Sequence, residues 1–257
     1  MQPFKNSPFA YGAGATAQSQ VQVDQGLRAF MLGVYNNMTI GLAISGLVAL
    51  GVNMLAMTHT ATGRIALTPF GQALYLSPLK WVVMLAPLAF IFIFSARMDR
   101  MAAATARTAF FAFAAVMGVS LSTILVVFTA ASVVQVFFIT AAAFGSLSLY
   151  GYTTQRSLSG MGSFLMMGLI GIIIASLVNV FLGSGALQFA ISVLGVLIFA
   201  GLTAYDTQKL KEMYVYEIGS ADGEVAAKAS IFGALTLYLD FINMFQFLLA
   251  LFGNRNN

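Results

Sequence analysis

The amino-acid sequence predicts an all-α, polytopic membrane protein with seven transmembrane helices, and three observations carry this prediction. Hydrophobic residues make up 60% of the 257 residues, only 8% are charged, and the mean hydropathy is +0.89. A soluble domain carries roughly 25% charged residues. Residues 108–155 and 157–205 hold no charged side chain at all, whereas a helix needs only about 20 apolar residues to cross a bilayer. An ordinary soluble protein and a disordered chain are therefore excluded.

The apolar segments divide the chain into seven expected spans. These are residues 29–57, 79–96, 109–129, 132–150, 163–182, 188–206 and 229–252. The turn between the third and fourth spans carries no charge, so one long buried helix is the alternative there, although the combined length favours two. Gly183-Ser184-Gly185 is a turn signal after the fifth span.

The spans form a single expected membrane domain over residues 29–253. Residues 1–28 contain no apolar core of a signal peptide, so we expect them to form a mobile, polar, cytoplasmic tail. In the loop at 209–228, Gly219 is expected to end a cytoplasmic extension of the sixth span. Asp222 is expected to cap the seventh.

The distribution of Lys and Arg predicts which side of the membrane each loop faces. With the N-terminus inside, the inner segments hold Lys5, Arg28, Arg97, Arg100, Arg107, Arg156, Lys209, Lys211 and Lys228. The outer segments hold Arg64, Lys80 and Arg255. This bias favours a cytoplasmic N-terminus. Because the basic residues lie in loops between apolar segments, they indicate membrane orientation, and no nucleic-acid partner is expected.

Small residues four apart favour close packing between helices in a membrane. Gly41 with Ser45, and Gly171 with Ala175, have this spacing. Lipid supplies no hydrophobic drive for helices to associate, so such pairs are expected at helix contacts.

Two acidic residues lie in the apolar segments, Asp206 and Asp240. Asp240 falls in the middle of the seventh span, and a charged side chain at that depth costs at least about 2.5–3.5 kcal/mol. Asp206 ends the apolar part of the sixth span. Because the two spans run antiparallel and meet on the cytoplasmic side, we expect the two carboxylates to approach each other.

Asp240 also belongs to a polar face of the seventh span. Thr236, Asp240 and Asn243 are spaced i, i+4 and i+7, which places them on one side of a helix. One interpretation is a buried hydrogen-bond cluster that fixes packing. The other is a cation or proton site, since carboxylates inside a membrane are functional by default.

A pair of neighbouring carboxylates would titrate as one unit. The singly protonated pair is cheap to hold in a membrane, whereas the dianion is a hard-oxygen site for Ca²⁺. Calcium prefers about 6–8 oxygen ligands, so two side chains favour weak, transient binding that suits permeation. Asp206 and Asp240 are the candidate metal ligands, and Ca²⁺ is the expected bound or permeant ion; no cofactor is expected.

Arg97, at the end of the second span, is a candidate countercharge that would pair with Asp206 or Asp240 and close the path. The alternative is that Arg97 only anchors the cytoplasmic end of its helix.

Enzymatic interpretations find no support in the sequence. The chain has no cysteine, and its one histidine, His59, lies in the loop after the first span. The last span contains no lysine that could hold retinal, and no glycine-rich phosphate loop is present. No catalytic residue is therefore assigned.

Two stretches carry a family resemblance. At Ala204-Tyr-Asp206-Thr-Gln208 and Leu237-Tyr-Leu-Asp240-Phe-Ile-Asn243, the chain resembles the Bax inhibitor family, also called transmembrane Bax inhibitor motif proteins, in its bacterial, YccA-like branch. The likeness runs from about Arg28 to Gly253.

The resemblance implies a seven-helix fold with the last helix central and a location in the bacterial inner membrane. It also implies a calcium-linked, pH-sensing aspartate pair, here Asp206 and Asp240, with an arginine latch that maps onto Arg97. The expected function is a pH-sensitive cation leak, of Ca²⁺ above all. The alternative is a membrane interaction protein that modulates an FtsH-type protease or another membrane partner, through the tail and the 209–228 loop.

Overall fold

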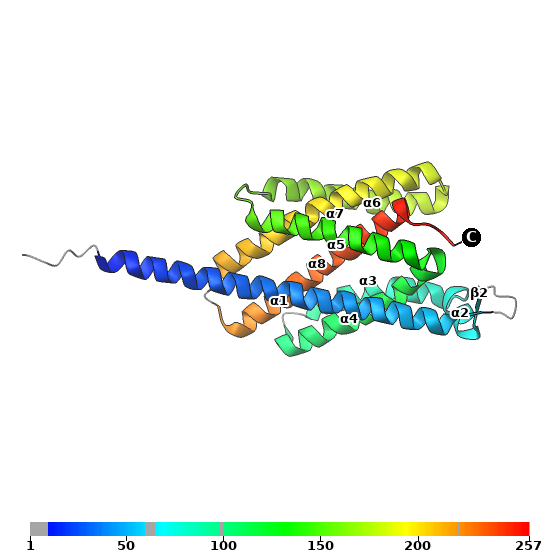
Figure 1. Cartoon of the computed structure of the whole chain (residues 1–257), viewed down its shortest axis with the longest axis horizontal. Coiled ribbons are helices and arrows are strands. Elements are labelled where there is room, and N and C mark those ends of the chain that lie inside the picture. Colours follow the sequence, from blue (N-terminus) through cyan, green and yellow to red (C-terminus); the bar gives the residue numbers. More distant parts are fainter. Residues whose placement is uncertain (1–9, 60–64, 98–99, 220, 257) are drawn as a thin grey trace, which may run out of the picture.

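The structure, a computed structural model, is a bundle of long helices (Figure 1). It describes residues 10–59, 65–97, 100–219 and 221–256, without the side chains of residues 10–23, His59, Ile65 and Ser95. In chain order the elements are α1 (Ala10–Ala56), β1 (Met57–His59), β2 (Ile65–Leu67), α2 (Pro69–Tyr75), α3 (Leu79–Arg97), α4 (Ala103–Val127), α5 (Ala130–Thr153), α6 (Ser159–Leu182), α7 (Gly185–Met213), the π-helical turn η2 (Tyr214–Ile218) and α8 (Gly223–Phe252).

The predicted all-α membrane architecture is confirmed. Six helices in the described residues are long and apolar enough to cross a membrane. The short α2 and the following α3 form a pair bent by 61°, which makes up to seven spans if the pair counts as one. Many large apolar side chains on the outside of the bundle are exposed, as on Phe181 and Met167 of α6. Such a surface suits lipid and is unfavourable in water.

The first helix begins earlier than the first expected span. Part of the expected tail, residues 10–28, is helical and continuous with the apolar part of α1, which projects beyond the bundle in Figure 1. The difference has a physical cause. After Pro8 the segment contains no proline, and Ala and Gln are good helix formers, so a helix that already exists can extend through it.

The third and fourth expected spans are two helices, as their combined length favours. Only Phe128 and Thr129 separate α4 from α5, and Thr129 caps α5 by accepting a hydrogen bond from Ser132 N. The segment after α8 packs on this turn and stabilises it. Phe128 forms an antiparallel bridge with Arg255, and Thr129 N donates a hydrogen bond to Asn254 O at 2.9 Å.

The connection between α7 and α8 is more helical than expected. After α7 the chain continues through η2, which ends at Gly219. Asp222 is the residue before α8, as predicted, but its side chain makes no capping hydrogen bond. The two antiparallel helices α7 and α8 pack against each other.

The last helix is the centre of the bundle, as the family resemblance implies. In the apolar stretch of α8, 56% of the residues are buried, whereas at most 28% are buried in the corresponding stretch of any other span. α8 packs against α1, α4, α5 and α7, and in Figure 1 it passes between α5 and α4. A polar side chain on α8 is thereby held away from lipid.

Candidate functional site

Asp206 and Asp240 lie together inside the bundle. Asp206 is on α7 and is half-buried, whereas Asp240 on α8 is only 5% exposed. The two carboxyl groups are close enough to interact electrostatically. Ionised carboxylates only accept hydrogen bonds, so a hydrogen bond between these two would require a shared proton.

One oxygen of the pair has no partner. Asp240 Oδ2 is buried and forms no hydrogen bond with the described part of the chain. A buried acceptor without a partner costs roughly 1–3 kcal/mol. The arrangement therefore keeps a strong oxygen ligand available to a proton or a cation in the middle of an apolar bundle.

The nearest countercharge is Lys209, which follows Asp206 by one helical turn on α7. Its ammonium group attracts the Asp206 carboxylate electrostatically, while its side chain is exposed. Lys209 thus neutralises part of the charge on Asp206 and leaves the deeper Asp240 without a cation of its own among the described residues.

The pair alone cannot form a closed metal cage. Among the residues that the structure describes, no three His, Cys, Asp or Glu side chains form a cluster that could hold a metal ion. A cation at the pair would need backbone carbonyls or water for the remaining oxygens that calcium prefers. This chemistry suits brief occupancy better than storage.

Thr236 and Asn243 share the polar face but are bonded within their own helix. Thr236 Oγ1 donates to Phe232 O at 3.1 Å, and Asn243 Nδ2 donates to Leu239 O at 2.8 Å. Both side chains are half-buried. No hydrogen bond of the described residues joins either one to the aspartates, so their supporting role stays a prediction.

Arg97 is exposed at the end of α3, and no ion pair joins it to either aspartate in the described part of the structure. Its helix packs mainly against α4 and α2. The latch role of Arg97 stays a prediction as well.

Two further motif residues hold α7 against its neighbours. Gln208 Oε1 accepts a hydrogen bond from Leu158 N at 2.7 Å, and Gln208 Nε2 donates to Arg156 O at 2.9 Å. Thr207 Oγ1 lies 2.9 Å from Ser148 Oγ of α5, which lies 2.6 Å from the Tyr35 hydroxyl of α1. These contacts fix α7 at the two residues that follow Asp206.

Tyr238 fixes α8 in the same way, two residues before Asp240. Its hydroxyl lies 2.6 Å from Ser45 Oγ, which donates to Ala114 O at 2.7 Å. Phe110 and Phe113 of α4 pack edge-on against its ring. Sequence reasoning missed Thr207, Gln208 and Tyr238, although their places beside the two aspartates were a usable signal.

Comparison with known proteins agrees with the fold and the motif. Residues 27–257 match the family described as inhibitor of apoptosis-promoting Bax1. The inner membrane protein YbhL of Escherichia coli is 45% identical over 241 residues, covering 93% of this chain and 97% of that protein. An uncharacterized protein of Caulobacter vibrioides is 47% identical over 238 residues, 93% of each chain. An uncharacterized protein of Rickettsia prowazekii is 41% identical over 242 residues, 94% of this chain and 96% of the relative.

These relatives share nearly the whole length of the chain, and the family match includes the membrane region and both aspartate motifs. The chain is a multi-pass membrane protein, and it belongs to the Bax inhibitor family.

Proposed function

We propose that this protein is a pH-sensitive cation leak channel of a bacterial inner membrane, with Ca²⁺ as the expected permeant ion and the N-terminus in the cytoplasm. The observation that carries the proposal is the pair of carboxyl groups on α7 and α8, of which Asp240 is almost fully buried and keeps one oxygen without a partner. Carboxylates inside a membrane mark ion or proton pathways.

The proposed switch is the proton shared by the pair. With the proton in place, the pair carries one negative charge, the two carboxyl groups attract each other and hold α7 against α8, and a divalent cation is attracted only weakly. Once the proton leaves, two negative charges repel at short range, and a divalent cation becomes the species that relieves the repulsion. Flux is therefore expected to rise as the pH increases.

Incomplete coordination explains why the ion would pass and not stay. Two side chains supply fewer oxygens than calcium prefers, and conduction needs binding that is strong enough for entry and weak enough for exit. Lys209 beside Asp206 adds a repulsive charge at one side of the site, which further shortens occupancy.

The test is Ca²⁺ flux into proteoliposomes, measured across a pH series with a trapped indicator. We expect Asp206→Asn and Asp240→Asn to lower flux at least tenfold at the high-pH end and to abolish its pH dependence. Asp222→Asn is the matched control, because that carboxyl group lies before α8 and makes no capping hydrogen bond. Unchanged flux in both aspartate variants would refute the proposal.

A second candidate is the interaction protein that modulates a membrane protease. The observation that favours it is the extension of α1 beyond the bundle (Figure 1). Deletion of residues 1–22 should then abolish co-purification with an FtsH-type protease, while Asp240→Asn should leave it intact. The opposite pattern would count against this function.

A further inference from the structure

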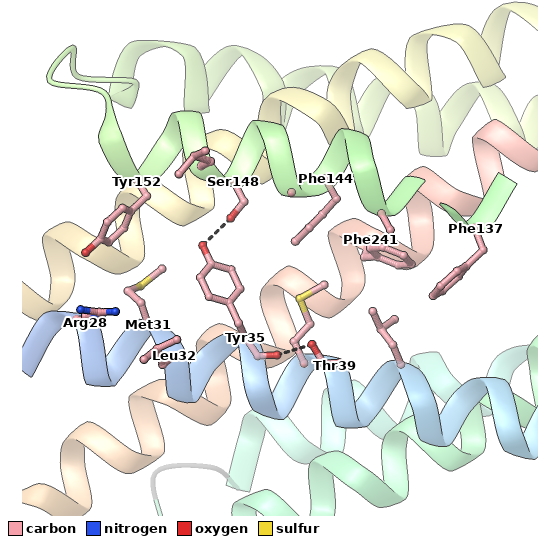
Figure 2. A pocket seen from close by; sticks show the side chains of 15 residues that line it. Arg28, Met31, Leu32, Tyr35, Thr39, Phe137, Phe144, Ser148, Tyr152 and Phe241 are labelled. Carbon is pink, nitrogen blue, oxygen red and sulfur yellow. Dashed lines mark hydrogen bonds between the residues drawn. The ribbon is translucent and has the colours of Figure 1, made fainter. Parts of the chain in front are cut away.

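We propose that the groove between α1 and α5 binds one anionic phospholipid of the surrounding bilayer, with an acyl chain along the groove and the phosphate at Arg28. This inference does not depend on ion conduction. Figure 2 shows the groove, which has a volume of about 770 Å³. That volume lies within the range of small-molecule sites, roughly 300–1,000 Å³.

The groove exists because α1 and α5 do not pack closely against each other. Each of them packs instead against α8, while α1 also contacts α4 and α5 also contacts α7. The hydrogen bond between Tyr35 and Ser148 crosses the gap, and the buried Ser148 forms a second hydrogen bond with Thr207 of α7. This polar contact therefore joins the two walls of the groove between its Arg28 end and its phenylalanine end (Figure 2).

The rims and walls of the groove suit an acyl chain. Leu32 on one rim is 59% exposed and Leu149 on the other is 62% exposed. Phe137, Phe144 and Phe241 line the far end (Figure 2). Rims of this kind are stable only in lipid, so the occupant is expected to enter sideways from the bilayer.

The charge at the other end of the groove selects the headgroup. Arg28 lies there, opposite Tyr152 of α5 (Figure 2). Lys211 of α7 donates to the carbonyl oxygen of Tyr152 at 2.9 Å, and its ammonium lies 5.7 Å from the ring centre of Tyr152. No acidic side chain is among the described residues that line the groove. Arg28, the cation of the described lining, has no acidic neighbour in that lining and complements a phosphate.

The position of this end fits the same occupant. Arg28 directly precedes the first expected span, and in the proposed orientation it faces the cytoplasm. Anionic lipids are recognised by basic residues in pockets between helices on that side, and arginine is suited to phosphate because its guanidinium forms paired hydrogen bonds.

The test measures lipid binding by native mass spectrometry of the full-length, delipidated protein in detergent. The probes are phosphatidylglycerol and phosphatidylcholine with identical acyl chains, and inorganic phosphate serves as a third probe for a headgroup-only site. We expect one phosphatidylglycerol to bind more tightly than phosphatidylcholine, with no binding of free phosphate. Equal affinity for the two lipids, or binding of phosphate alone, would overturn the proposal.

Two variants separate the headgroup contact from the acyl-chain contact. Arg28→Gln should weaken phosphatidylglycerol binding about fivefold, the effect of one basic residue at an anionic surface, and should leave phosphatidylcholine unchanged. Gly145→Leu should weaken both lipids, because Gly145 lines the groove and its side-chain position is open space.

Matched controls keep this test decisive. Arg107→Gln changes an exposed arginine on α4, and Gly171→Leu adds the same side chain at an open position on α6. Equal effects of each variant and its control would refute the groove as the site. A dimer that dissociates only in Gly145→Leu would also refute it, because the occupant would then be a second copy of the chain.

Discussion

Asp240 combines a position on the most buried helix with a carboxyl oxygen that lacks a partner. Nothing in the packing of the bundle requires an acid there, because the other large side chains buried on α8 are apolar apart from the bonded Tyr238. An acid in such a place lowers stability unless it is paired. We therefore propose that Asp240 is present for function and that the neighbouring polar side chains position the pair.

Gln208 is the residue for which this positioning role is easiest to measure. Gln208→Leu keeps the size of the side chain but leaves Leu158 N and Arg156 O without their partners. We expect a loss of about 1–3 kcal/mol in the free energy of unfolding, read as a lower melting temperature in detergent. Gln135→Leu, at an exposed position on α5, is the control and should have little effect. Equal melting temperatures for the two variants would remove this role from Gln208.

At the scale of the elements, backbone contacts between helices decide the arrangement. A side chain at Gly151 of α5 would collide with the Ala204 carbonyl of α7, and one at Gly118 of α4 would meet Ser45 O of α1 at 2.6 Å. Such close approaches replace the hydrophobic drive that is missing in lipid. The α5–α7 contact also brings Ser148 to Thr207, next to Asp206 in the chain.

The contact at Gly151 predicts opposite effects for two identical substitutions on one helix. Gly151→Ala should destabilise the protein by about 1–3 kcal/mol through overpacking. Gly145→Ala meets open space and should be neutral or slightly stabilising, because alanine favours helix. Thermal unfolding of the two purified variants in the same detergent checks this difference. A Gly151→Ala variant as stable as the wild type would show that α5 and α7 are not in backbone contact.

The sequence predicts the helices better than it predicts their contacts. Hydropathy along the chain located α4 to α8, with bounds that differ from the helices by up to seven residues. The cost of a buried charge singled out Asp206 and Asp240. Gly171, however, was expected at a helix contact, and its side-chain position faces open space. Spacing along one helix cannot show which neighbour that helix meets. The same limit hid the link from Tyr35 through Ser148 to Thr207, which joins three helices.

Short elements were the other feature that hydropathy did not reveal. The hairpin of β1 and β2 and the short α2 fill the region between the first two expected spans. Thr68 caps α2 and Pro69 follows it, a start signal for a helix too short to give a periodic pattern. The bend of 61° between α2 and α3 arises because α2 is a separate short helix.

For the whole molecule, the side of the membrane on which each loop lies depends on the number of spans, because each span carries the chain to the opposite side. If α2 and α3 together cross the membrane once, the N-terminal segment and the α5–α6 turn lie on the same side. If they do not, these two segments lie on opposite sides. The chain has no cysteine, so single introduced cysteines report accessibility without further changes.

We predict that, in intact cells, a membrane-impermeant maleimide labels Gly185→Cys but neither Ser19→Cys nor Ser157→Cys. All three should react once the membrane is permeabilised. Labelling of Ser157→Cys but not Ser19→Cys in intact cells would show that the α2–α3 pair does not span. Labelling of Ser19→Cys would contradict the cytoplasmic N-terminus.

The most direct test of the central claim, that the carboxyl groups of Asp206 and Asp240 act as one site, is a double-mutant comparison of Ca²⁺ flux in liposomes across pH. Groups that work as a unit have strongly non-additive effects. We predict that Asp206→Asn, Asp240→Asn and the double variant show the same loss of flux and the same flat pH profile. Losses that add independently, or a pH response that survives in the double variant, would contradict the claim.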